Sequence, residues 1–212
     1  MFSGLAVSLR LAAAADARPD VLAPDERQRL AGFAHPDRRA GFVLGRTAAR
    51  LLLADELSVA PEAVPLAVGA DGAPEVASGA VPDALYVSIA HAGRGEPLAG
   101  AALAGRPVGL DLERVRPRNP GLWRRMLAAE EHGVMDALGG PTDEAQTLLW
   151  SLKEAVLKGC RTGLRAGMRS VALADLDPER QRLLARDGAG GLWRVGYARR
   201  GDLWVSVALR EA

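Results

Sequence analysis

The chain of 212 residues is long enough to bury a core in one large domain or in two small ones. Its single cysteine, Cys160, excludes an internal disulfide, and no Cys/His cluster has zinc-ligand spacing, so we expect a reducing, cytoplasmic setting. A net charge of +1 argues against bulk nucleic-acid binding, and the lack of an apolar run of about 18 residues argues against a membrane-spanning helix.

The first half of the chain mixes strand and helix signals. Pro24-Asp25-Glu26 is typical of a helix start, with proline in the first turn and acids at the positive end of the helix dipole. Alternating apolar residues predict strands, amphipathic repeats predict helices, and Gly- and Pro-rich stretches predict loops. In chain order we expect a strand at 4–11, helices at 24–33 and 38–57, loops and short strands at 66–81, and a hairpin of strands at 85–90 and 98–104.

The second half repeats this order of elements. We expect a strand at 107–113, helices at 121–138 and 142–160, and strands at 170–173, 192–198 and 203–209. The repeat predicts an α+β fold of two pseudo-symmetric lobes, residues 1–105 and 106–212, each a small antiparallel sheet packed with helices. Because small ligands usually bind between domains, we expect the active site in the cleft between the lobes.

Two carboxylates alternate on the predicted strand 107–113. Asp111 and Glu113 are two residues apart, so both side chains point to one face of the strand while Leu112 points to the other. Such acids repel each other unless a hard cation lies between them, and Mg²⁺ typically takes one or two carboxylates together with phosphate oxygens. A solvated strand end is the alternative for an isolated D-x-E pattern.

The predicted helix 142–160 carries the chain's only two lysines, Lys153 and Lys158, among 27 basic residues. This exception suggests positions that need a compact ammonium group. Trp150, Glu154 and Lys158 are spaced four residues apart, so they line one stripe of the helix, separate from the apolar stripe, and can face a cleft. An ordinary surface ion pair between Glu154 and Lys158 is the alternative.

His91 ends the predicted strand 85–90, immediately before Gly93-Arg94-Gly95, where backbone and side chains could approach a phosphate. His35 and His132 have no such neighbours and are assigned no role.

Three segments, in this order, resemble the Sfp-type 4'-phosphopantetheinyl transferases. They are the strand ending Ser-Ile-Ala-His at residues 88–91, the strand Val-Gly-Leu-Asp-Leu-Glu at 108–113 and the helix Trp-Ser-Leu-Lys-Glu-Ala-Val-Leu-Lys at 150–158. The third motif is long and specific, and the first is weak. The resemblance covers nearly the whole chain and implies a two-lobed enzyme that moves phosphopantetheine from coenzyme A to a serine of an acyl- or peptidyl-carrier protein, as in fatty-acid, polyketide or nonribosomal peptide synthesis.

By this resemblance, Asp111, Glu113 and Glu154 would hold Mg²⁺ together with the coenzyme A pyrophosphate, and Lys158 and His91 would contact phosphates. Phosphoryl transfer depends mainly on positioning and charge stabilisation, which such a set supplies without a covalent intermediate. Glu154, directly or through a water, is the candidate that takes the serine proton. The expected catalytic residues are therefore Glu154, Lys158 and Asp111.

The resemblance is thinner on the side of the adenosine 3'-phosphate. The positions there that match the family region expected to bind coenzyme A are Arg27, Arg29 and Gly72-Ala73-Pro74. The family often has basic residues where this chain has Glu26, Gly41 and Ala73, and a serine where it has Ala90. Other arginines, such as Arg38, Arg39 or Arg46, would then hold the 3'-phosphate, and affinity for coenzyme A would be lower than usual.

The segment after Glu113 is the expected docking surface for the carrier protein. In the family this segment receives the carrier helix, and carrier domains are commonly acidic around their serine. We predict that Arg116, Arg118 and Met126 dock the carrier, and we expect a monomer. Burial of Met126 in the core of the helix 121–138 is the alternative.

Three other functions compete with this interpretation. One is a catalytically silent module that binds coenzyme A or a carrier protein, which the intact acidic motif argues against. Another is a different Mg²⁺-dependent nucleotide or phosphoryl transferase, which no glycine-rich P-loop supports. Nucleic-acid binding through the arginines of residues 114–125 would predict a basic face and steep salt dependence, and the near-neutral charge disfavours it.

Overall fold

The computed structural model describes residues 2, 4–77, 79, 84–92, 95–117, 119, 121–128 and 131–212. The fold is α+β, as predicted, with small antiparallel sheets and helices. The chain divides into two compact units, Ser8–Gly105 and Met1–Val7 with Arg106–Ala212. The first seven residues thus group with the C-terminal unit, whereas the sequence analysis counted them with the first lobe.

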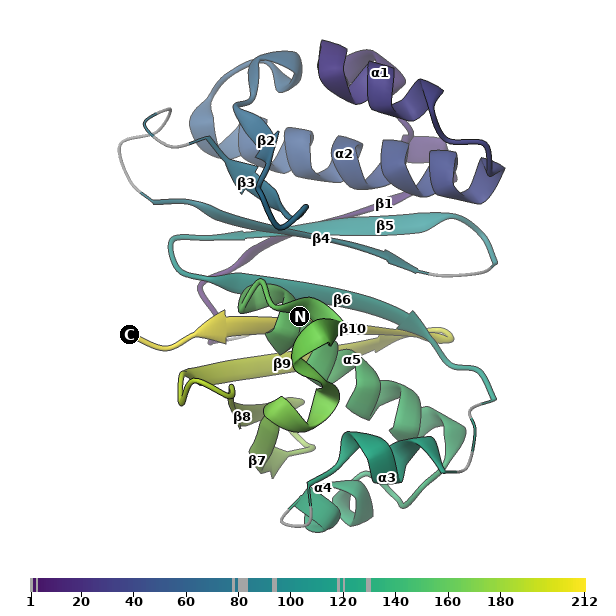
Figure 1. Cartoon of the computed structure of the whole chain (residues 1–212), viewed down its shortest axis with the longest axis vertical. Coiled ribbons are helices and arrows are strands. Elements are labelled where there is room, and N and C mark those ends of the chain that lie inside the picture. The colour runs from purple at the N-terminus through teal and green to yellow at the C-terminus, as the bar shows by residue number, and fades with distance from the viewer. Residues whose placement is uncertain are drawn as a thin grey trace. The chain divides into compact units, whose positions relative to one another are not determined.

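The unit Ser8–Gly105 is built on a three-stranded antiparallel sheet of order β1-β5-β4. Helix α2 lies along this sheet (Figure 1), and a separate two-stranded sheet pairs β2 with β3. The bounds are β1 Ser8–Ala13, α1 Pro24–Ala31, α2 Pro36–Leu57, β2 Leu66–Val68, β3 Pro74–Val76, β4 Tyr86–Ala92 and β5 Leu98–Ala104.

Helix α2 forms because its apolar residues recur at the helical period. Leu44, Ala48 and Leu52 are buried and share one face, which packs on small and apolar side chains of β5 such as Ala101 and Leu103. The helix starts at Pro36, where a missing N–H costs nothing, and ends at Ser58 in a left-handed conformation.

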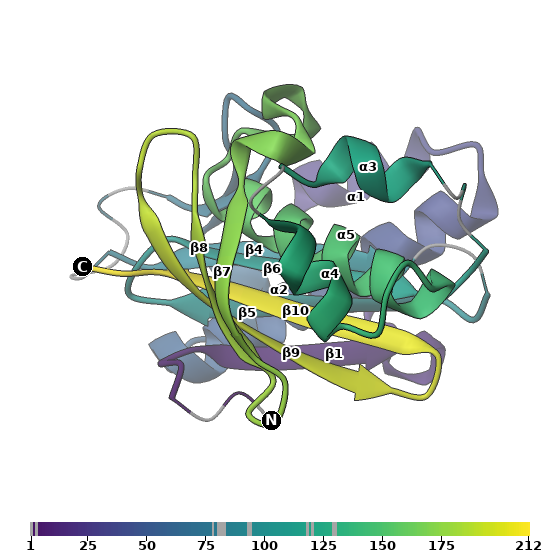
Figure 2. The same ribbon diagram turned by 90° about the horizontal axis from the view of Figure 1, so that it is seen from below.

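The C-terminal unit has a five-stranded antiparallel sheet of order β6-β10-β9-β8-β7. Helices α3, α4 and α5 lie together on one face of this sheet (Figure 2), where they share one apolar core with it. The bounds are β6 Val108–Arg114, α3 Leu122–Met126, α4 His132–Ala137, α5 Asp143–Gly159, β7 Ala172–Asp177, β8 Arg182–Arg186, β9 Leu192–Arg200 and β10 Leu203–Arg210.

Helix α5 is the centre of this unit. Thr142 caps it, because the Thr142 hydroxyl accepts a hydrogen bond from the backbone N–H of Ala145 at 3.1 Å. Its apolar stripe, which includes Leu148, Leu152 and Ala155, is buried against the sheet. Glu154 and Lys158 lie outside this stripe, at side-chain exposures of 22% and 27%.

The single helix expected over residues 121–138 is instead two short helices, α3 and α4. At described residues at the end of α3 and just after it, backbone groups bond to side chains. The N–H of Ala128 donates to Glu131 Oε2 at 2.7 Å, and the carbonyl of Met126 accepts from Lys153 Nζ at 2.8 Å. No helix in the part of the chain that the structure describes is long and apolar enough to cross a membrane.

Candidate active site

Strand β6 and helix α5 meet in direct backbone contact at Gly109. A Cβ atom placed on Gly109 would overlap the carbonyl oxygen of Ala155 and lie 2.6 Å from the amide nitrogen of Gly159. A Cβ atom on Gly159 would in turn lie 2.5 Å from the indole of Trp193. Both glycines are therefore needed for α5 to lie this close to β6, and the contact brings the polar side chains of the two elements together.

Asp111 follows Gly109 on the same face of β6, and α5 supplies its partners. Lys158 Nζ donates a hydrogen bond to Asp111 Oδ1 at 2.8 Å and lies 3.8 Å from Glu154 Oε1. Glu113, the next residue on this face, pairs with Arg116 at 3.1 Å. The structure thus groups the side chains of Asp111, Glu154 and Lys158 within one small cluster, with Glu113 next along the strand.

The cluster carries more negative than positive charge, and its side chains are partly shielded from solvent. Asp111 is only 4% exposed, and none of the described residues forms a hydrogen bond with its Oδ2 atom. Burial raises the pKa of Glu154, and the neighbouring charge of Asp111 raises it further against the opposing effect of Lys158. For Lys158, burial alone would lower the pKa, but the carboxylates of Asp111 and Glu154 outweigh burial and raise it.

Magnesium was predicted at Asp111, Glu113 and Glu154. Among the described residues, no group of three or more His, Cys, Asp or Glu side chains has the geometry of a formed metal site. The donor set nevertheless fits a hard cation, because carboxylate oxygens are the ligands that Mg²⁺ prefers and the buried Oδ2 atom of Asp111 lacks a hydrogen-bond donor. The magnesium site stays a prediction.

Comparison with known proteins bears on the chemistry of this cluster. Residues 107–208, which include β6 and α5, match the family model of the 4'-phosphopantetheinyl transferase superfamily. The predicted resemblance is confirmed. A Synechocystis sp. protein provisionally named a 4'-phosphopantetheinyl transferase is 28% identical over 181 residues, 82% of this chain and 71% of its own length.

Two Bacillus subtilis proteins are similar at lower identity. A 4'-phosphopantetheinyl transferase is 24% identical over 70% of this chain and 64% of its own length. The 4'-phosphopantetheinyl transferase Sfp of strain 168 is 24% identical over 72% of this chain and 66% of its own length. This chain therefore spans about two thirds of the length of these relatives. The matched family model and these three relatives support a phosphopantetheinyl transferase activity.

The N-terminal unit holds a second group of residues that the resemblance to phosphopantetheinyl transferases singled out. His91 on β4 lies against α2, where Gly41 and Gly45 leave room for its ring: a Cβ atom on Gly45 would lie 2.6 Å from His91 Nε2. His91, Arg29 and Arg38 are among the residues that line a cavity of about 430 Å³. The Gly41 that departs from the family pattern thus makes space for the histidine.

Aromatic rings also line this cavity, and the sequence analysis did not single them out. Phe33 and Phe42 are in contact, with ring centroids 5.3 Å apart, and the guanidinium of Arg29 lies 5.7 Å from the Phe42 ring. A flat ring beside cationic groups suits a planar, anionic ligand.

Four of the residues predicted to bind coenzyme A lie outside the described lining of this cavity. Arg27 is exposed on α1, Gly72 lies in the turn between β2 and β3, and Pro74 is the first residue of β3. Arg46 is buried, 3.4 Å from Glu26 and over the ring of Phe42.

Glu26, another departure from the family pattern, has a structural role that the sequence did not reveal. It is 3% exposed and accepts a hydrogen bond at 2.6 Å from Arg50, which is also buried and donates to backbone carbonyls of residues 61–64. Glu26 thus supplies the carboxylate that a buried arginine on α2 requires.

The structure places the predicted docking residues in different environments. Met126 was expected on the surface, but it is 1% exposed and belongs to the core shared with α5, so that prediction is wrong. Met126 is the last residue of α3. Arg116 is exposed and pairs with Glu113. Arg118 lies outside the residues that the structure describes.

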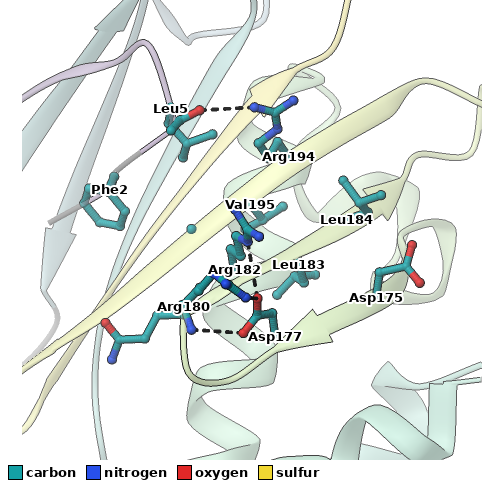
Figure 3. A pocket seen from close by; sticks show the side chains of 13 residues that line it. Phe2, Leu5, Asp175, Asp177, Arg180, Arg182, Leu183, Leu184, Arg194 and Val195 are labelled. Atoms are coloured by element: carbon teal, nitrogen blue, oxygen red, sulfur yellow. Dashed lines mark hydrogen bonds and ion pairs between the residues drawn. The ribbon is translucent and has the colours of Figure 1, made fainter.

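The C-terminal unit has another cavity, of about 460 Å³, between the N-terminal segment and strands β7 to β9 (Figure 3). Phe2 and Leu5 pack beside Gly196, and three arginines line the rest. Each of these arginines already has an acidic partner: Arg180 and Arg182 pair with Asp177, and Arg194 pairs with Glu211. Because these arginines are already paired with carboxylates, the cavity offers a phosphate less positive charge than its lining suggests.

Proposed function

We propose that the protein transfers the 4'-phosphopantetheine group of coenzyme A to a serine hydroxyl of an apo acyl- or peptidyl-carrier protein and releases adenosine 3',5'-bisphosphate, as the Sfp-type enzymes do. The observation that carries this proposal is the buried Asp111 carboxylate, with one oxygen held by Lys158, the other without a hydrogen-bond donor among the described residues, and Glu154 beside it. The superfamily match over the same strand and helix supports it.

The three carboxylates would hold the metal ion. Asp111, Glu113 and Glu154 supply oxygen ligands from two rigid elements, strand β6 at the edge of the sheet and the packed helix α5, which favours a fixed arrangement. Bound there, Mg²⁺ would neutralise charge on the pyrophosphate of coenzyme A. Lys158 would add a positive charge for the leaving phosphate, since its raised pKa keeps it protonated at neutral pH.

The chemical step is a single displacement at phosphorus. The serine oxygen of the carrier attacks the phosphorus that bears pantetheine, a new P–O bond forms, and the bond to the bridging oxygen breaks. Adenosine 3',5'-bisphosphate departs with that oxygen, and the serine proton passes to the Glu154 carboxylate directly or through a water. Such transfers require positioning and charge stabilisation more than covalent chemistry by the protein.

The cavity of the N-terminal unit would take the nucleotide end of coenzyme A. Phe33 and Phe42 offer faces for the adenine, while Arg29, Arg38 and His91 offer positive charge or donors for the 3'-phosphate. Arg46 would contribute less directly, because it is buried against Glu26.

The test is mass spectrometry of purified apo-carrier proteins after incubation with coenzyme A, Mg²⁺ and the enzyme. Transfer predicts that the carrier gains the mass of phosphopantetheine and that EDTA prevents the gain. A protein that binds coenzyme A and carrier but never modifies a panel of fatty-acid, polyketide and peptide-synthesis carriers would instead be a silent binding module.

A further inference from the structure

Lys153, the residue before Glu154, is a buried cation that the proposed reaction does not use. Its side chain has no exposure to solvent. Its Nζ atom donates to Val171 O at 2.6 Å and Met126 O at 2.8 Å, with Met168 O at 3.2 Å, and it pairs with Glu131 Oε2 at 2.7 Å. An ammonium group has only three N–H bonds, and four acceptors already share them. No N–H bond of Lys153 is therefore left for a substrate.

Glu131 extends this network to the backbone on both sides. It is 1% exposed, its Oε2 atom also accepts from the N–H of Ala128, and its Oε1 atom accepts from the N–H of Leu173, both at 2.7 Å. The Lys153–Glu131 pair therefore joins three places in the chain to α5: the end of α3, the turn Met168–Ser170 and the start of β7.

The end of α3 belongs to the segment that follows Glu113, where the carrier protein is expected to dock. A further bond supports the same segment, because Arg169 donates to the carbonyl of Arg124 at 2.7 Å. By contrast, α5 is held on β6 by the contact of Gly109 with Gly159. The docking segment and the catalytic cluster thus have separate supports, and only the first depends on Lys153.

We propose that Lys153, together with Glu131, is a positioning residue that holds the carrier-docking segment, residues 121–128, in a fixed place relative to Glu154. This inference rests on the proposed transfer to a carrier protein. Lysine suits the position because the compact ammonium reaches carbonyls from several directions, whereas the planar fork of an arginine would not. Loss of the pair would leave the catalytic cluster assembled but its protein substrate poorly presented.

Lys153→Met and Glu131→Gln test this role. Both should raise KM for the carrier by about fivefold or more while KM for coenzyme A changes by less than about twofold, because only the docking segment is released. Hydrogen exchange should accelerate at the amides of Ala128 and Leu173, because Lys153→Met removes the counter-ion of their acceptor and Glu131→Gln replaces one of the two acceptor oxygens with an amide nitrogen. Glu131→Gln keeps the shape of the side chain and serves if Lys153→Met fails to fold.

Leu149→Ala is the matched control. Leu149 is buried in the same helix and contributes to the same core, so its truncation also costs stability but leaves the pair intact. If this variant raises the carrier KM as much as Lys153→Met does, or if Lys153→Met raises both KM values equally, the positioning role is wrong. Faster hydrogen exchange at the Ala128 amide of Lys153→Met, together with an unchanged KM for the carrier, would also contradict the positioning role.

Failure of the proposed function gives a different result. In that case the wild-type protein modifies no carrier at all, whereas the exchange experiment, which needs no carrier, still reports whether the pair holds the segment. A wild-type enzyme that transfers, with variants that transfer at unchanged carrier KM, would contradict the positioning role alone.

Discussion

Gly109→Ala should disrupt the active site from a position that touches no substrate. The added methyl group would overlap the carbonyl oxygen of Ala155 and lie 2.6 Å from the Gly159 nitrogen. Both are backbone atoms, so no side chain can rotate away, and α5 must move off β6 by about 1 Å or more. Overpacking of this kind costs about 1–3 kcal/mol, and we expect the upper end.

The displacement should affect catalysis as well as the fold. A shift of about 1 Å between reacting groups lowers rates by about a hundredfold, and the Lys158–Asp111 hydrogen bond spans the same two elements. Thermal unfolding and carrier-modification rates are the measurements, and a Tm lower by about 10 °C is expected. Gly133→Ala is the control, because among the described residues no atom outside its chain neighbours and its own helix backbone lies within 4 Å of the added methyl group.

Two results would refute this reasoning. A Gly109→Ala protein with wild-type Tm and wild-type turnover would mean that β6 and α5 can separate freely. A destabilised protein with full turnover would mean that their contact supports the fold without setting the geometry of the catalytic cluster.

Three further predictions follow from the site. Lys158→Ala should lower kcat more than it raises KM for coenzyme A, since the lysine acts as the pyrophosphate departs; unchanged kinetics with lower Tm would contradict this. Arg116→Gln should raise the carrier KM severalfold at low salt and little at high salt, with KM for coenzyme A constant; equal effects on both constants would place docking elsewhere. Burial, followed by the charge of Asp187, raises the pKa of Cys160 to about 12, so at pH 8 its thiol should resist iodoacetamide until the protein unfolds, and rapid labelling of folded protein would be inconsistent with this.

Local periodicity was enough to predict which side chains share a face of β6 and which share a stripe of α5, whereas the meeting of the two elements was implied only by the family resemblance. A strand alternates its side chains, so Asp111 and Glu113 share a face. A helix repeats every 3.6 residues, so Glu154 and Lys158 share a stripe. Both patterns are properties of short segments, and tertiary packing did not override them.

The predictions that failed depend on contacts between distant residues. Met126 follows a run of arginines and resembles a surface residue in sequence, but packing against α5 buries it. The expected helix 121–138 is interrupted because its backbone bonds to Lys153 and Glu131, and the lysine is 27 residues from Met126. No local sequence pattern indicates such a distant partner. Arg50 likewise is 24 residues from Glu26.

The number of lysines was an informative signal whose meaning sequence could not resolve. Both lysines occupy places where an ammonium contacts several oxygens, as the composition suggested. Their environments differ completely, however, because Lys153 is enclosed by backbone carbonyls and Lys158 faces carboxylates. Only the tertiary structure distinguishes a positioning lysine from a candidate catalytic one.

The most direct test of the proposed function measures both products of transfer at once. Apo-carrier protein, coenzyme A and Mg²⁺ are incubated with wild-type enzyme or with Asp111→Ala, and holo-carrier and adenosine 3',5'-bisphosphate are quantified by mass spectrometry and chromatography. We predict equal amounts of the two products from the wild type, none from Asp111→Ala, and none when the carrier serine is replaced by alanine. Bisphosphate release without a modifiable serine, or wild-type turnover by folded Asp111→Ala, would contradict the proposed function.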